Sequence, residues 1–195
     1  MAIAPSAGNN LRVTNSIISH NTAAIRDGGI YMGRSGDASL EVAYSSVVYN
    51  AAYGNDQIGG GIHNRSDGEC TVVNTILRNL SDGELSDLGA AYSDQECVVS
   101  HTLITGAANS DYVDTGDNIT GVQPELMALT ENGGIGGRTH QPGLGSPVIG
   151  AGQNLGNAPE WDLRGSGFPR ILGEGLDMGA HEVRNAVFHD RFEVV

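Results

Sequence analysis

The chain has 195 residues, of which 29 are glycine, and its 23 acidic and ten basic residues give a formal net charge of −13. All ten basic residues are arginine, and this acidic balance argues against binding to nucleic acid or to an anionic membrane. No apolar run is long enough to span a membrane. Residues 1–8 lack the basic region and the apolar length of a signal peptide. The length is that of one domain.

The first half of the chain repeats one pattern. Residues 11–21, 40–50 and 70–79 align with one another, and a weaker fourth copy begins at Cys97. The three full copies close on asparagines that are 29 positions apart in sequence: Asn21, Asn50 and Asn79. A fixed period of this length indicates stacked structural units.

Each copy alternates short apolar, often β-branched residues with polar ones, which is typical of a strand. A second strand signal with glycines follows each asparagine, at 28–31, 59–63 and more loosely 89–92. Short strands in a unit of this size predict a parallel β-helix of about four coils over residues 11–121. We expect residues 1–10 to form an improvised N-terminal cap and residues 122–195 to form a C-terminal cap of the same domain.

Identical positions on neighbouring coils lie about 4.8 Å apart. We therefore expect an inward ladder in which the amides of the three asparagines bond to one another. A second polar ladder is expected beside it: Ser16, Ser45, Asn74 and His101.

The two cysteines, Cys70 and Cys97, occupy the same repeat position on consecutive coils. Their expected Cα separation suits a disulfide. Parallel side chains in a flat ladder would hold the Cβ atoms slightly too far apart, so a buried pair of free cysteines is the favoured alternative. A zinc site would need about four ligands, and two cysteines do not supply them.

From residue 121 on, the repeat gives way to a series of short motifs. They are QPEL at 123–126, ENGG at 131–134, TH at 139–140, GSPVIGAG at 145–152, DLRG at 162–165, FPR at 168–170 and DMGAHE at 177–182. Their order and spacing resemble the C-terminal part of the bacterial "choice-of-anchor Q" and polymorphic outer membrane protein-like β-helix proteins. The repeats before them resemble the coils of the same family.

This resemblance implies a right-handed parallel β-helix of the pectin-lyase type, exported to the periplasm, the outer membrane or the exterior. It supplies no catalytic residue. The chain departs from the family at Gly150, where Asp is usual, and at His181, where an aromatic residue is usual. Because the repeats begin at Leu11 without a preceding cap, we expect a C-terminal fragment of a longer secreted protein.

Acidic residues recur in the connections that follow the asparagines. They are Asp56, then Asp82, Glu84 and Asp87, then Asp111, Asp114 and Asp117. Stacked coils would align them along one edge, where hard oxygen ligands in flexible loops suit Ca²⁺. The favoured alternative is a solvated acidic face, because the spacing is not that of a known calcium loop.

Tyr31, His63 and Tyr92 are predicted to form an outward ladder on the glycine-rich strands, where rings could stack on sugars. His63 is close in sequence to Asp56 and Arg65 and is therefore a candidate base or metal ligand. His181 and Glu182 form a second candidate acid–base or metal group. An ordinary surface ladder is the favoured interpretation, since no glycosidase or lyase motif is present.

Two functions follow from these patterns. The first is a non-catalytic secreted module that binds glycans or Ca²⁺, in the manner of an adhesin fragment. The second is a metal-dependent hydrolase or lyase that acts on polysaccharide or phosphodiester bonds through the His63 face and the acidic edge. An uncapped first coil also predicts a homodimer joined near Leu11, Val13, Ile30 and Tyr31, because unpaired strand edges invite pairing.

Overall fold

The computed structural model describes residues 2–3, 10–33, 37–54, 60–89, 96–106, 112–172 and 175–184. Within these ranges the regular elements are strands, and no helix occurs. No helix in the described part of the chain is therefore long and apolar enough to cross a membrane. The all-β class predicted from the repeats is confirmed.

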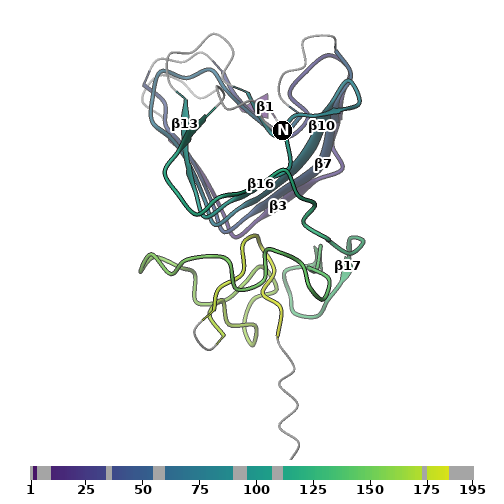
Figure 1. Ribbon diagram of the computed structural model, residues 1–195, viewed down its shortest axis with the longest axis vertical. Coiled ribbons are helices and arrows are strands. Elements are labelled where there is room, and N and C mark those ends of the chain that lie inside the picture. The colour runs from purple at the N-terminus through teal and green to yellow at the C-terminus, as the bar shows by residue number, and fades with distance from the viewer. Residues whose placement is uncertain are drawn as a thin grey trace, which may run out of the picture.

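Parallel strands form three sheets whose members come from successive repeats (Figure 1). The first contains β1 (Ala2–Ile3), β5 (Ile30–Met32), β8 (Ile62–Asn64) and β12 (Leu88–Gly89), in that spatial order. The second contains β2 (Leu11–Thr14), β6 (Leu40–Ala43), β9 (Cys70–Val73), β13 (Cys97–Ser100) and β15 (Tyr112–Asp114). The third contains β3 (Ile17–Ser19), β7 (Ser46–Ala52), β10 (Ile76–Ser81), β14 (Leu103–Ile104) and β16 (Ile119–Thr120).

Four short strands complete the set. In the third sheet, β4 (Thr22–Ala23) pairs with β7 in parallel, and β11 (Glu84–Leu85) folds back antiparallel on β10. Farther along the chain, β17 (Thr130–Glu131) and β18 (Arg138–Thr139) form an antiparallel pair.

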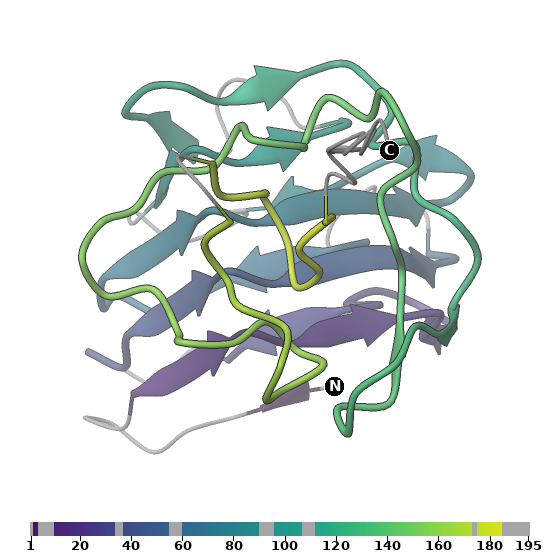
Figure 2. The same cartoon turned by 90° about the horizontal axis from the view of Figure 1, so that it is seen from below.

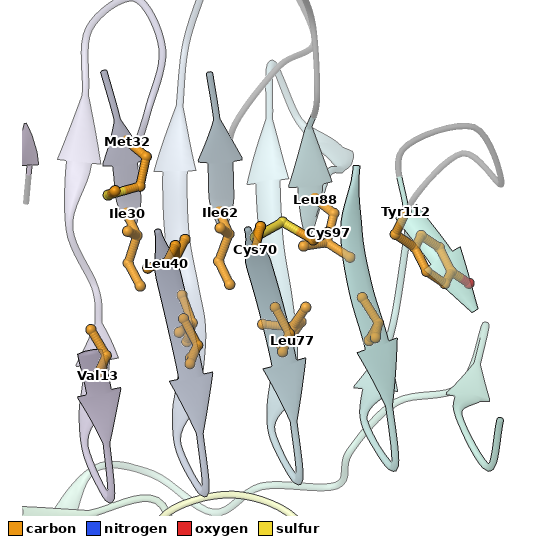
Figure 3. Close-up of a cluster of buried hydrophobic side chains, with 14 of the residues drawn as sticks. Val13, Ile30, Met32, Leu40, Ile62, Cys70, Leu77, Leu88, Cys97 and Tyr112 are labelled. Atoms are coloured by element: carbon orange, nitrogen blue, oxygen red, sulfur yellow. A yellow bond between two sulfur atoms is a disulfide. The ribbon is translucent and has the colours of Figure 1, made fainter. Parts of the chain in front are cut away.

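The core lies between the three sheets and is built from the predicted apolar positions (Figure 3). Val42, Val47 and Val72 are essentially inaccessible to solvent, as are Ile30 and Ile62 from the first sheet. Because a single repeat contributes only a few such residues, no repeat could bury its apolar side chains without its neighbours.

The repeat period contains one irregularity. Leu40 pairs with Cys70, a separation of 30 positions, whereas the asparagines keep a separation of 29. The difference is taken up in β7, whose pairing with β10 shifts after Arg78. Tyr49 is the extra residue, and its φ of 58° marks a β-bulge.

This irregularity corrects the second predicted ladder. The corner residues are Asn15, Tyr44, Asn74 and His101, all with positive φ. The hydroxyl ladder next to them therefore continues from Ser16 and Ser45 to Thr75 and Thr102, and not to Asn74 and His101. The backbone N–H of Ser16 donates to Ser45 Oγ at 3.1 Å, and that of Thr75 donates to Thr102 Oγ1 at 3.4 Å.

Cys70 and Cys97 form a disulfide across neighbouring strands of the second sheet (Figure 3). Their Cα atoms are 4.5 Å apart, within the range that a disulfide spans. The favoured expectation of two free thiols was wrong, because stacking at this distance brings the sulfur atoms within bonding reach.

The edge predicted to be open at Ile30 and Tyr31 is occupied. β1 pairs in parallel with β5, so that Ala2 lies opposite Tyr31 and Ile3 lies opposite Met32. Ile30 is fully buried. The remaining strand edges at the start of the stack are those of β2 and β3.

Residues 122–172 and 175–184, the lateral segment, lie along the side of the stack and do not lie over its end (Figures 1 and 2). Corner residues of three successive repeats form hydrogen bonds to this segment. The segment meets the third of these repeats first and the first of them last. Asn74 Nδ2 donates to Gln153 O at 2.8 Å, Tyr44 Oη to Asn157 Oδ1 at 2.8 Å, and Asn15 Nδ2 to Trp161 O at 3.0 Å. The segment thus advances four residues per coil along one corner, as a lateral cover in place of the predicted end cap.

Candidate functional site

The asparagine ladder is confirmed and determines where the neighbouring side chains point. Asn21 Nδ2 donates to Asn50 Oδ1 at 2.9 Å, and Asn50 Nδ2 donates to Asn79 Oδ1 at 2.9 Å. The residues before Asn21 and Asn50 are His20 and Tyr49, with φ of 57° and 58°. Because the bulge turns the chain at these two positions, their rings leave the sheet on its outer side.

His20, Tyr49 and Arg78 stack as planar groups along the axis of the repeats. The ring centroids of His20 and Tyr49 are 5.4 Å apart. The guanidinium of Arg78 lies over the Tyr49 ring, 4.8 Å from its centroid. Arg78 Nε also donates to Gln123 Oε1 at 2.7 Å, which fixes the guanidinium plane. His20 and Gln123 are exposed, and Tyr49 and Arg78 are half-buried.

His140 supports this stack from the lateral segment. Its ring centroid is 5.3 Å from that of His20 and 5.1 Å from that of Tyr49. Burial lowers the pKa of His140, the hydrogen bond to the Met127 carbonyl opposes that shift, and His20 adds to it. The imidazole is therefore neutral at pH 7, with Nδ1 2.9 Å from Met127 O.

We call this group the His20–Tyr49 patch: His20, Tyr49, Arg78, Gln123, Glu125 and His140. Burial raises the pKa of the Tyr49 phenol, the nearby Arg78 charge lowers it, and Glu125 raises it. The phenol thus keeps its proton at neutral pH and can donate a hydrogen bond. The patch combines an exposed imidazole and a half-buried phenol with polar groups beside them, and ligand sites commonly contain such combinations.

The predicted ladder of Tyr31, His63 and Tyr92 forms only in part. Tyr31 pairs with His63, and their ring centroids are 5.4 Å apart. The strand partner of His63 on the other side is Gly89, and Tyr92 lies outside the described residues. The His63 side chain is only 1% exposed, so this ladder is not the open sugar-stacking face that was expected.

His63 pairs with a carboxylate that the sequence did not indicate. Its Nδ1 is 2.5 Å from Asp27 Oδ1, and its Nε2 is buried without a hydrogen-bond partner among the described residues. Asp27 reaches this position with a φ of 70°, directly before two tightly packed glycines. Arg65 lies two residues farther along, and its backbone N–H donates to Met32 O. The predicted partner Asp56 lies outside the described residues.

The described acidic residues of the connections do not gather along one edge. Asp82 and Glu84 are exposed at the β10–β11 turn. Asp114 accepts from Gly116 N and Asn118 Nδ2, and Asp117 lies 3.2 Å from His101 Nε2. Asp111 is outside the described residues. Within the described ranges no three His, Cys, Asp or Glu side chains are placed to hold a metal ion.

Asp87 is a structural carboxylate and not a surface ligand. It is fully buried, and its two oxygens accept five hydrogen bonds. The donors are the backbone and side chain of Asn79, the backbone and hydroxyl of Thr105, and the backbone of Gly106. Its prediction as a metal ligand was therefore wrong, because no lone pair faces solvent.

His181 and Glu182 are buried within the lateral segment. His181 Nδ1 is 2.8 Å from Thr139 Oγ1, and Glu182 accepts the backbone N–H of Asp177. Burial lowers the pKa of His181 to about 4. Arg170, which is fully buried, lies 3.7 Å from Glu182 and bonds to Asn15 Oδ1 across the interface. Arg170 thus helps to attach the lateral segment, and these buried groups present nothing to a ligand.

The sequence did contain a signal for the His20–Tyr49 patch. A large polar or aromatic residue precedes each ladder asparagine: His20, Tyr49 and Arg78. The alternation of the strands alone does not distinguish these positions from ordinary strand residues, because it does not reveal a bulge. The contributions of Gln123, Glu125 and His140 come from outside the repeats and follow no period.

Comparison of the chain with protein-family models, with curated proteins and with solved structures gave no match.

Proposed function

We propose that this chain is a right-handed parallel β-helix module of a secreted or surface-exposed protein, and that it binds carbohydrate at the His20–Tyr49 patch. Support for the architecture comes from the strand order, in which successive repeats add parallel strands to three sheets. Support for export comes from the family resemblance of the motifs after residue 121.

The observation that carries the proposed binding function is the planar stack of His20, Tyr49 and Arg78 on the outer side of the third sheet. Ring faces cover the apolar face of a sugar, and Tyr49 keeps its hydroxyl proton for hydrogen bonding. Arg78 and Gln123 are already bonded to each other, so little conformational entropy is lost when a ligand binds. Glu125 supplies an acceptor for sugar hydroxyls and disfavours anionic ligands.

The test is binding to a panel of neutral polysaccharides and oligosaccharides by affinity electrophoresis and calorimetry. Tyr49→Ala should weaken binding about five- to tenfold, because one aromatic contact contributes about 1 kcal/mol or more. Tyr53→Ala is the matched control, since Tyr53 is 60% exposed and belongs to no described ring stack. Loss of binding in Tyr31→Ala but not in Tyr49→Ala would move the site to the Tyr31–His63 face.

A second candidate function rests on Asp27 and His63. A carboxylate at Nδ1 fixes the imidazole tautomer and leaves Nε2 as the basic nitrogen, the arrangement used in hydrolases. Because Nε2 is buried here, this function also requires the covering residues to move when a substrate binds. Hydrolase or lyase activity would be tested on ester, phosphodiester and polysaccharide substrates, with and without EDTA. Activity that is lost in His63→Ala but kept in Tyr49→Ala would favour this function over simple binding.

A further inference from the structure

The third sheet ends at β3, and that edge is incompletely covered. Ile18 is half-buried, whereas Val47 and Leu77, which occupy the same position on β7 and β10, are fully buried. In the next coil the backbone N–H of Ser46 donates to Ser16 O, and that of Ala51 donates to Asn21 O. The matching outward groups of β3 and β4 have no strand partner within the described residues, because the sheet stops there.

The asparagine ladder ends at the same edge with a free acceptor. Asn50 Oδ1 accepts both the backbone and the side-chain N–H of Asn21. Asn79 Oδ1 accepts the same pair of donors from Asn50. Asn21 Oδ1 has no donor in the described part of the chain, although its amide is held in the same orientation. The edge thus presents the acceptor that another asparagine would use.

The lateral segment forms an outer wall beside this edge. A groove runs between residues 16–19 with Asn21 on one side and Leu129, Gly136, Arg138 and Leu163 on the other. The loop between β17 and β18 reaches past the first strands of the stack (Figure 2). We call this space the edge groove. It exposes strand backbone, the apolar side chain of Ile18, the Asn21 amide and the cationic Arg138 together.

We propose that the edge groove binds an extended segment of a partner polypeptide, which adds to β3 as a further parallel strand. The repeat register determines the chemistry of that segment. It carries an apolar residue opposite Ile18 and an asparagine opposite Asn21, whose backbone and side-chain N–H groups donate to Asn21 Oδ1. Main-chain hydrogen bonds supply affinity and these two positions supply specificity, as in other cases of strand addition. This interaction is independent of carbohydrate binding.

The probe is a fluorescein-labelled peptide that copies residues 40–52, which fit this pattern in the chain itself. Fluorescence anisotropy with the whole protein should show saturable binding. Replacing the peptide asparagine that corresponds to Asn50 by leucine should weaken binding at least tenfold. Asn21→Leu in the protein should have a similar effect, whereas Asn154→Leu, at an exposed loop, should not.

Register is tested by covalent trapping under conditions that leave the Cys70–Cys97 disulfide intact. A cysteine introduced by Ser19→Cys should form a disulfide with a peptide cysteine at the position of Val48, which is the strand neighbour of Ser19. A peptide cysteine two positions away should not be trapped. Absence of peptide binding, or binding that is insensitive to Asn21→Leu, would overturn the proposal. A third outcome is that the peptide does not bind but the protein self-associates, as measured by light scattering, and Asn21→Leu abolishes the association. The occupant of the edge groove would then be a second copy of this chain, and the proposed partner would be wrong.

Discussion

Asn79 donates its side-chain N–H to Asp87 Oδ1 at 3.1 Å, and this bond ends the asparagine ladder inside the protein. The ladder thus begins at an exposed amide, Asn21, and ends at a buried carboxylate. The amide oxygens of Asn50 and Asn79 accept hydrogen bonds from the asparagine of the preceding repeat, so the Asn79 amide needs an acceptor of its own. A carboxylate meets this need because it accepts without having to donate.

Asn50→Leu should lower the free energy of unfolding by about 1–3 kcal/mol, because it leaves buried donors and acceptors unpaired. Asn50 accepts from Asn21 and donates to both Asn79 Oδ1 and Ile18 O. Asn21→Leu should cost less, since its side chain lies at the exposed end of the ladder. Chemical denaturation of the two variants measures the difference. Equal costs would contradict a cooperative ladder.

Asp87→Asn should also destabilise the protein by about 1–3 kcal/mol. Both carboxylate oxygens now accept hydrogen bonds, one from Thr105 and Gly106 and the other from Asn79. In the variant, the side-chain NH₂ group would replace one of these oxygens and face N–H donors. Asp82→Asn is the control, because Asp82 is exposed and an asparagine tolerates its φ of 48°. Thermal and urea unfolding compare the pair, and indistinguishable curves would rule out this role for Asp87.

The repeats predicted much of the fold because the length of the sequence period determines which residues lie opposite one another on stacked strands. The spacing of the three asparagines was enough to predict their hydrogen bonds. The second ladder was misplaced by one residue after Ser45, because the bulge at Tyr49 offsets strand register from asparagine register. Sequence alternation carries no mark of such an insertion.

The site depended on features that no period encodes. In the sequence, Asp87 is indistinguishable from the other acidic residues of the connections. Its burial follows from the antiparallel pairing of β11 with β10. Asp27 pairs with His63 across 36 positions through a left-handed turn. The lateral segment contains no sequence repeat. Individual hydrogen bonds to Asn15, Tyr44 and Asn74 hold it in position, and no periodic pattern marks them.

The disulfide between Cys70 and Cys97 closes a loop with a sequence separation of 27. Constraining a loop of this length in the unfolded chain stabilises a protein by about 2–4 kcal/mol. Adding a reductant to the unfolding experiment should therefore lower the midpoint of the wild type. The Cys70→Ala/Cys97→Ala variant should start lower and show no response to reductant. A wild-type midpoint unchanged on verified reduction would contradict the expected contribution.

The stability of the protein should fall as the pH rises toward 8. Burial, and next the charge of Asp177, raise the pKa of Glu182 to about 8, while Arg170 opposes this shift. In the unfolded chain the same carboxyl titrates near its ordinary value of 4.5. Between these values the folded protein holds a proton that the unfolded chain releases, so this group makes the free energy of unfolding fall as the pH rises.

His181 acts in the opposite direction at lower pH. Its pKa falls from an ordinary value of 6.5 to about 4, so its contribution to stability increases between those values and is constant above 6.5. The interval from pH 6.5 to 8 therefore separates Glu182 from its neighbour. Melting temperatures of the wild type should fall across this interval, and Glu182→Gln, which mimics the protonated group, should remove that part of the slope. Glu160→Gln, at an exposed position, should keep the wild-type slope, and parallel curves for all three proteins would contradict a protonated Glu182.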